Sequence, residues 1–380
     1  MVRAMAATDS FTRLRKVAAD PSGTVGEMRA VCQDLMKAAE GLSPEELAIR
    51  ASELCDITGV EDPERASLGA LMLGALVEMG CPVHVVGAAV VGRTRKELEL
   101  AVPHYEALCE SDIGETALTA DEEAQAVYGG GYTVRRDEAE RHAQENPRGA
   151  AAYRAIETLY RPFVVMVTRD SNLRAQTRAD RALLSAAEAL RSDVASFLHK
   201  LLQGVACEQW VILCPAERRG FLVEVREIVD NFALQPLLAN ALVHENHGGF
   251  FGVGQKTVGP ESGIPGRRPD PALIACLHGE GPQELGTGVE GWWNLYTHRA
   301  IDVTGKLIDD VPREDWVWNE GIPRDIPELD GHRLVVLGHS TYHRSWNANR
   351  LFFSLGSHID LVRRLADDDF NRWLRACATR

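Results

Sequence analysis

The amino-acid sequence predicts an α+β protein. An all-helical N-terminal region, built as helical repeats or a bundle, is expected to precede a small mixed or antiparallel sheet domain with flanking helices. Helix-start motifs recur at regular intervals early in the chain, strand-like alternation begins only near residue 208, and all seven tryptophans lie at or after Trp210. We place the helical part at 1–118, a set of long connecting helices at 119–206, and a Trp-rich α+β domain at 207–380.

Cap residues predict the N-terminal helices. Thr24 stands three residues before a glutamate, as in a capping box, while Ser43 and Asp62 are each followed by a proline suited to the first helical turn. With Pro82, these starts lie 19, 19 and 20 residues apart. Two helices in about 40 residues is the period of HEAT and armadillo repeats, so this region is expected to form helical pairs or a bundle.

The middle of the chain is predicted to be helical with two interruptions. A helix capped at Thr119 should stop at the glycines of 129–131, and a helix over 149–170 should kink or split at Pro162. The segment 172–202 is the most helical of the chain. Its apolar residues follow heptad spacing, which fits either a core helix or the seam of a homodimer: Leu183, Ala187, Leu190, Val194, Phe197 and Leu201.

The C-terminal domain is predicted around a hairpin. The apolar run 210–214 turns through 215–220 into the alternating run 221–225, and a helix capped near Asp230 should pack on the resulting sheet. A short helix is expected from Pro271 to His278, strands at 293–303, 316–319 and 333–337, and a final amphipathic helix over 357–376.

Composition excludes some classes of function. The net charge is −14, from 41 basic and 55 acidic residues, and no basic cluster offsets it, so no nucleic-acid partner is predicted. No stretch approaches the ~20 apolar residues of a membrane span, and the N-terminus has no apolar signal segment. The eight cysteines are scattered without a Cys-x-x-Cys pair. We therefore expect a cytoplasmic protein with reduced thiols and no membrane association.

Catalytic candidates come from two patterns. The strand-like run before Ser340 resembles the start of a hydrolase nucleophile elbow, although Tyr342 occupies the position of the second glycine. Histidines cluster late in the chain, with eight of twelve after residue 243. The catalytic candidates are His244, Glu245, His247, Ser340 and His343, and the metal-ligand candidates are His244, His247, Cys276 and His278. His244 and His247 are expected to share a helical face, and no cofactor is predicted.

The segment 248–266 contains seven glycines in nineteen residues, which predicts a loop without regular structure. Its apolar residues Phe250 and Phe251 would be unusual in a solvated linker, so the loop is a candidate lid or partner-docking segment. The alternative is that the two phenylalanines fill the edge of the core.

A Trp-rich motif supplies the remaining candidates. Residues 315–327, DWVWNEGIPRDIP, lie between the hairpin with its Asp230-Asn-Phe232 sequence and a second motif, 342–347, YHRSWN. This order of motifs resembles a group of uncharacterised bacterial proteins over about 208–350, and the resemblance implies no activity. The motif forms either an aromatic edge of the core or the wall of a ligand or partner groove, with candidate residues Trp316, Trp318, Glu320, Arg324 and Asp325.

Two functions follow from these patterns. The first is a non-enzymatic interaction or adaptor protein that binds a protein partner through a helical-repeat surface and the Trp-rich domain. The second is a metal-dependent enzyme of the hydrolase type that uses the late histidine and acidic residues beneath the glycine-rich loop.

Overall fold

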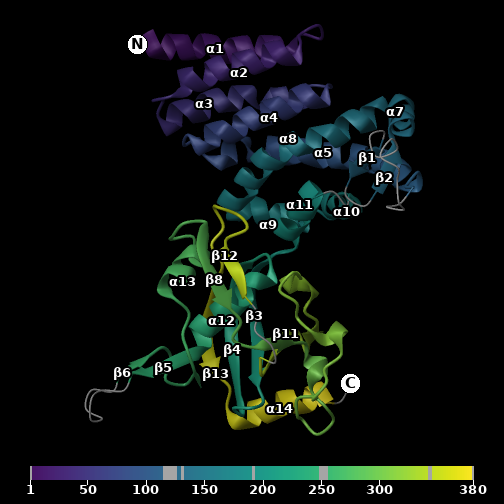
Figure 1. Cartoon of the computed structure of the whole chain (residues 1–380). Helices are drawn as coiled ribbons and strands as arrows, with labels where there is room; N and C mark the ends of the chain where they lie inside the picture. Colours follow the sequence, from purple (N-terminus) through teal and green to yellow (C-terminus); the bar gives the residue numbers. More distant parts are fainter. Residues whose placement is uncertain are drawn as a thin grey trace. The chain divides into compact units, whose positions relative to one another are not determined.

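The chain consists of two compact units, Met1–Leu202 and Gln203–Arg380, in a computed structural model. The structure describes residues 2–113, 126–129, 132–190, 193–247, 256–340 and 345–378. The first unit is mainly helical and the second combines small sheets with helices (Figure 1), so the predicted α+β class is confirmed. Within the described residues, no helix is long and apolar enough to cross a membrane.

The first unit begins with helices stacked side by side (Figure 1). They are α1 (Val2–Ala19), α2 (Val25–Ala39), α3 (Pro44–Leu54), the short η1 (Cys55–Gly59), α4 (Pro63–Glu78) and α5 (Val83–Glu110). Thr24 and Ser43 form the expected capping boxes, and the Asp62 side chain accepts a hydrogen bond from the backbone N–H of Arg65. The predicted helix starts are thus confirmed, and the apolar stripes that follow them pack into one core.

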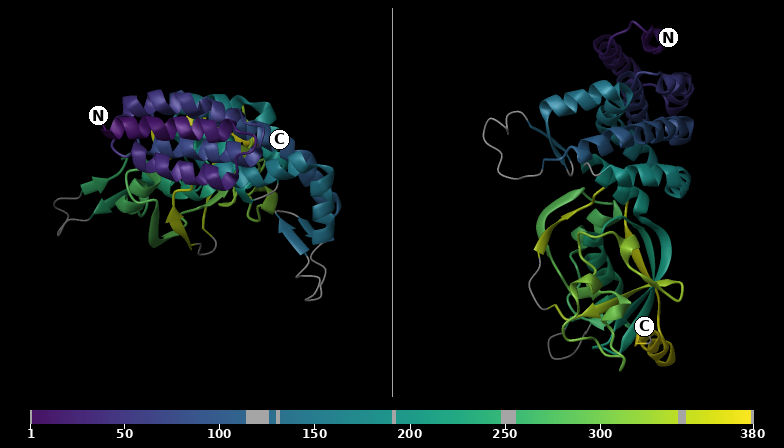
Figure 2. Two further views of the ribbon diagram at one scale, coloured as in Figure 1. Left: turned by 90° about the horizontal axis from the view of Figure 1, so that it is seen from above. Right: turned by 90° about the vertical axis from the view of Figure 1, so that its right-hand side faces the viewer.

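The second half of this unit contains a hairpin and further helices. The hairpin, β1 (Ala126–Gly129) and β2 (Tyr132–Arg135), lies beside α7 (Arg136–Glu145) at one end of the helices in both views of Figure 2. Helix α8 (Pro147–Arg169) packs on α4 and α5. It continues through Pro162 and does not split there. The first part of the helix predicted from Thr119, and two of the three glycines that should end it, lie outside the described residues. The last part of that prediction is wrong, because Ala126–Gly129 forms the strand β1.

The continuous helix predicted over 172–202 is wrong. The structure has α9 (Ser171–Ala179), α10 (Arg181–Ala189) and α11 (Asp193–Gln203). Asp180, between α9 and α10, and Leu190, after α10, have extended backbone, and the Asp180 carboxylate caps α10 through the N–H groups of Ala182 and Leu183. The heptad residues therefore do not form one seam. Leu190 is buried, whereas Phe197 is 38% exposed.

The main sheet of the second unit is mixed. Its strands run in the order β10-β11-β3-β4-β13, and β9 also pairs with β11. The expected hairpin is confirmed as β3 and β4, which pair antiparallel, while β11 runs parallel to β3. The bounds are β3 (Val205–Cys214), β4 (Arg219–Ile228), β9 (Asn294–Tyr296), β10 (Glu328–Leu329), β11 (His332–Gly338) and β13 (His358–Arg364).

Helices cover both faces of this sheet. On one face, Trp210, Ile212 and other alternate residues pack on α12 (Leu234–Leu242). The short η2 (Asn231–Ala233) precedes α12, and Asp230 caps it as expected. On the other face, Val211 and Leu213 pack with α14 (Asp367–Ala378). The single helix predicted over 357–376 is wrong, because His358–Arg364 pairs with β4 and only the later residues are helical.

The remaining elements surround the main sheet. Strand β5 (Val243–His247) pairs with β6 (Lys256–Val258) and β7 (Ile264–Pro265), so the described part of the glycine-rich segment contains strands where a structureless loop was expected. Helix α13 (Pro271–His278) is confirmed with Asp270 as its cap. Strand β8 (Glu284–Glu290) pairs with β12 (Ser345–Asn349), and single turns form η4 (His298–Ala300), η5 (Arg313–Asp315) and η6 (Pro323–Asp325). The strand expected at 316–319 is reduced to a bridge between Tyr296 and Trp316.

Candidate functional site

Two tryptophans of the 315–327 motif form one wall of a cavity of about 300 Å³ in the second unit. The rings of Trp316 and Trp318 stack with centroids 5.1 Å apart and planes 16° from parallel. Tyr296 meets Trp316 edge to face at 5.0 Å. Trp318, at the outer end of this row, is 40% exposed. We call this cavity the indole pocket.

Backbone contacts hold the indole rings in place. The Val317 N–H donates to the Leu295 carbonyl, which aligns the motif beside β9 and places alternate side chains on the same side. The Trp316 Nε1–H donates to the Val311 carbonyl at 3.0 Å, and the Trp318 Nε1–H donates to the Arg313 carbonyl at 3.1 Å. The polar edge of each indole is thus bonded to the protein, and the rings present aromatic surface to the pocket.

Asn231 fixes the base of the indole pocket. Its side chain is buried, and its Nδ2 donates to the Trp318 carbonyl at 2.8 Å. Gly321 permits this approach, because a Cβ at this position would lie 2.9 Å from Nδ2 of Asn231. Asn231, which follows the helix cap Asp230, therefore also holds the turn after Trp318 in place.

The charged residues of the indole pocket are predominantly acidic. The lining includes the carboxylates of Glu314 and Asp325 and one cation, Arg299. Arg299 lies 3.9 Å from Asp315, which is itself mostly buried and accepts a hydrogen bond from Thr297. No salt bridge to Glu314 or Asp325 occurs among the residues that the structure describes. An aromatic wall with carboxylates beside it suits a cationic group, through cation–π attraction and charge-assisted hydrogen bonds.

The structure brings together three of the predicted surface residues, Trp316, Trp318 and Asp325, at this pocket. Glu320 and Arg324 are close to these residues in the sequence and are exposed, but they do not line the indole pocket. The Arg324 guanidinium lies 3.4 Å from Gln203. Phe250 and Phe251 lie outside the described residues. Sequence reasoning did not select Thr297, Arg299 and Glu314, because they carry no motif and reach the pocket only through the packing of separate segments.

His244 and His247 do not share a helical face, so that prediction is wrong. Helix α12 ends at Leu242, and both histidines lie on β5, whose backbone pairs with two other strands. Residues three apart on a strand lie on opposite faces, which removes the expected pairing. The His244 side chain is buried, and the side chain of His247 lies outside the described part of the chain. Glu245 accepts a hydrogen bond from the Arg268 backbone N–H at 2.8 Å.

The other metal-ligand candidates have protein contacts. The Cys276 thiol is buried against the Gln283 carbonyl, and the His278 ring stacks on His358 with centroids 4.2 Å apart. Burial lowers the pKa of both histidines, and the proximity of His278 lowers the pKa of His358 further. Among the described residues, no three His, Cys, Asp or Glu side chains lie close enough together to hold a metal ion.

The predicted nucleophile Ser340 is exposed directly after β11. His343 lies outside the described residues. The next described element is the strand β12, whereas a nucleophile elbow leads from a strand into a helix. The surroundings of Ser340 therefore do not reproduce the fold on which that motif depends.

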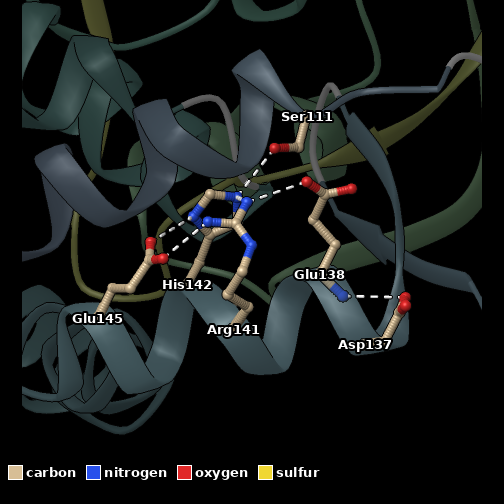
Figure 3. Close-up of polar contacts among 6 residues, drawn as sticks. All are labelled: Ser111, Asp137, Glu138, Arg141, His142 and Glu145. Carbon is tan, nitrogen blue, oxygen red and sulfur yellow. Dashed lines mark hydrogen bonds and ion pairs between the residues drawn. The ribbon is translucent and has the colours of Figure 1, made fainter.

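A Ser–His–Glu network lies in the first unit, where the sequence indicated no site (Figure 3). Ser111 Oγ lies 2.8 Å from Nε2 of His142, and Glu145 lies 3.7 Å from Nδ1 of the same ring. This order of nucleophile, base and carboxylate is found in hydrolases with an activated serine. Arg141 adds a charge to the network through contacts with Glu138 and Glu145.

Two features oppose nucleophilic chemistry in this network. Ser111 caps the C-terminal end of α5, where the negative end of the helix dipole disfavours an oxyanion. The Arg141 guanidinium lies 3.3 Å from Nε2 of His142, so it competes with the serine hydroxyl for the one lone pair of that nitrogen. We assign the network a structural role, in which it ties the end of α5 to α7.

Comparison with known proteins does not extend this picture. The chain matches no protein-family model, no curated protein and no solved structure.

Proposed function

We propose that this chain is a non-enzymatic interaction protein whose second unit recognises an arginine or lysine side chain of a partner protein in the cytoplasm. The observation that carries the proposal is the meeting of the stacked Trp316 and Trp318 rings with the Glu314 and Asp325 carboxylates at one pocket. Indole faces attract cations, and carboxylates bind guanidinium and ammonium groups.

The size of the indole pocket supports a side chain as the ligand. A cavity of about 300 Å³ is at the small end of ligand sites, which suits one anchoring group of a larger partner. Buried tryptophan and arginine residues are the commonest anchors of protein interfaces. The stacked helices of the first unit provide a separate surface of the kind that helical-repeat proteins use for binding.

The state of the cysteines supports the cytoplasm as the compartment. All eight are free thiols in the structure, and four of them are buried. Burial raises the pKa of Cys32 and Cys81 to about 11 and that of Cys377 to about 12, so these thiols remain protonated at neutral pH. Protonated, unpaired cysteines suit a reducing environment.

Calorimetric titration with short capped peptides tests the proposal. Acetyl-Gly-Arg-Gly-Arg-Gly-amide should bind, whereas the peptide with glutamine in place of arginine should not. Trp318→Ala should weaken binding by a factor of about 2 to 30, the range of a cation–π contact. Glu314→Gln with Asp325→Asn should weaken it further and remove most of its dependence on salt.

A matched control separates the pocket from general apolar contact. Phe353 is another exposed aromatic residue of the second unit, 64% exposed and outside the indole pocket. Phe353→Ala should leave the affinity unchanged. Equal binding of the arginine and glutamine peptides, or equal affinity of the wild-type and Trp318→Ala proteins, would reject recognition of a cation at this pocket.

A further inference from the structure

A cavity of the second unit lies where the parallel strands β3 and β11 end, and it is separate from the indole pocket. Its volume is about 710 Å³, within the range of sites for small organic molecules. The turn after β3, the end of β11, the loop 304–309 and helix α14 surround it. Parallel pairing of Leu213 with Val336 brings the carboxyl ends of both strands to this one place. We call it the strand-end cavity.

Part of the lining of the strand-end cavity is apolar. Tyr296, Leu307, Leu337, Phe370 and Leu374 all line it. Gly338, the last residue of β11, makes this wall possible, because a Cβ there would lie 2.4 Å from the Tyr296 ring. The ring therefore packs directly on the strand end, and the wall continues along α14.

Other residues of the lining carry positive charge. Arg218, Lys306 and His339 line the cavity together with a single carboxylate, Asp309, and the neutral Asn371. No salt bridge in the described part of the chain includes Arg218, Lys306 or Asp309. The lining thus contains two permanent cations and one carboxylate, and the His339 imidazole adds a further hydrogen-bonding group.

Arg218 is held in a backbone conformation that arginine rarely adopts. Its φ is 49°, in the left-handed region that favours glycine, and its N–H donates to the Pro215 carbonyl to close the turn between β3 and β4. Glycine would satisfy this turn with less strain, but it would supply no charge. The turn therefore places a cation in the cavity lining at a conformational cost.

We infer that the strand-end cavity binds an amphipathic organic anion, with its apolar part against Tyr296, Phe370 and Leu374 and its anionic group toward Arg218 and Lys306. The inference rests on charge complementarity and on the presence of both apolar and cationic residues in the lining. It does not depend on the function proposed for the indole pocket, which has acidic lining and a different class of ligand.

The probe for this inference is 8-anilinonaphthalene-1-sulfonate, an amphipathic anion whose fluorescence rises in apolar surroundings. It should bind the folded full-length chain and be displaced by octanoate. Octan-1-ol has the same apolar chain without the charge, and inorganic phosphate has charge without the chain, so both should displace it weakly. Octyl phosphate tests whether the type of anionic head group matters. If octanoate and octyl phosphate both displace the probe more strongly than octan-1-ol and inorganic phosphate do, the result supports a site for amphipathic anions of either head group.

Three variants locate the binding. Arg218→Gly and Lys306→Gln should each weaken probe and octanoate binding by about two- to fivefold, as expected for an exposed charge contact. Arg218→Gly should also raise the Tm by about 2–4 °C, because glycine relieves the strained turn. Arg313 is an exposed cation of the same unit outside the cavity, so Arg313→Gln should leave binding unchanged.

The stabilised Arg218→Gly variant keeps the inference falsifiable, because a loss of binding in this variant cannot come from unfolding. Unchanged affinity in both Arg218→Gly and Lys306→Gln would overturn the inference. Displacement by octan-1-ol that equals displacement by octanoate would also overturn it, since it would show an apolar surface without recognition of charge. If inorganic phosphate displaced the probe as strongly as octanoate does, the apolar part of the ligand would contribute nothing to binding. That result would also overturn the inference.

Discussion

The guanidinium of Arg93 lies 2.7 Å from the carboxylate of Glu97 in the core of the first unit, with 2% and 0% of the two side chains exposed. One turn of α5 separates the pair, and Arg93 also donates a hydrogen bond to the Thr58 carbonyl of η1. Burial raises the pKa of Glu97, and the positive charge of Arg93 opposes that rise. Arg93 thereby joins α5 to η1, and neither charge of the pair is accessible to water.

Removing one member of this pair is expected to destabilise the protein strongly. Glu97→Gln leaves the Arg93 charge buried without its partner, so the free energy of unfolding should fall by about 3–5 kcal/mol. Arg95 and Glu99, 2.8 Å apart on the same helix and each 45% exposed, supply the control. Glu99→Gln should change stability by less than about 1 kcal/mol. Urea denaturation of both variants checks the prediction, and equal losses would contradict it.

Gly74 on α4 and Pro162 on α8 form a close contact that a larger residue cannot keep. A Cβ at position 74 would lie 2.8 Å from Cβ and 3.0 Å from Cα of Pro162. Gly74→Ala should therefore push the two helices apart and lower the free energy of unfolding by about 1–3 kcal/mol.

Gly92 supplies the opposite case in a neighbouring helix. It is exposed on α5, and a Cβ there would meet nothing within 4 Å. Gly92→Ala should stabilise the protein by about 0.5–1 kcal/mol, because alanine has the higher helix propensity. Thermal melts of the two variants should shift in opposite directions. A Tm for Gly74→Ala at or above that of wild type would show that α4 and α8 are not in close contact.

The stacked pair His278 and His358 predicts acid sensitivity. Burial lowers the pKa of both rings below the ordinary value near 6.5, so the unfolded chain binds protons more readily than the folded one. Stability should be retained above about pH 6.5 and lost as the pH falls through that value toward the lowered pKa values. Glu280 and Asp360 raise these pKa values and Arg226 lowers them, but burial is the largest cause for both rings.

Replacement of one ring tests this acid sensitivity. His358→Gln should reduce the difference in the free energy of unfolding between pH 7.5 and pH 5.5. The exposed His84 of the first unit is the control, and His84→Gln should leave the pH dependence unchanged. If the stability of wild type and of His358→Gln depended on pH to the same extent, the histidine pair would not be the cause of the acid sensitivity.

Helix α11 offers a test of the predicted homodimer. Phe197 is 38% exposed, whereas Leu190 before the helix is 1% exposed. If two copies associate through this face, Phe197→Asp should convert a dimer to a monomer with little change in Tm. Leu190→Asp should instead unfold the protein, because it buries a charge in the core. Light scattering measures the mass, and a mass unaffected by Phe197→Asp would reject association through α11.

The sequence by itself determined the features that depend on neighbouring residues. Thr24 and Ser43 cap their helices through residues three positions away, and in the second unit Asp230 and Asp270 cap through residues three and two positions away. The hairpin of β3 and β4 is equally local, since a short turn joins two strands of alternating pattern. Each of these elements is stabilised by contacts within a few residues, and such contacts can be read from spacing alone.

Tertiary structure decided the elements whose backbone partners are distant in the chain. Residues 243–247 and 358–364 have patterns that also fit helices, and they are strands because β6, β7 and β4 supply their hydrogen bonds. The candidate sites depend on the same long-range contacts. The indole pocket joins Asn231 to residues 297–327, and the strand-end cavity joins the turn at 215–218 to Leu374. Tryptophans at alternate positions indicated an aromatic surface, but only the packing of distant segments determined which charges lie beside it.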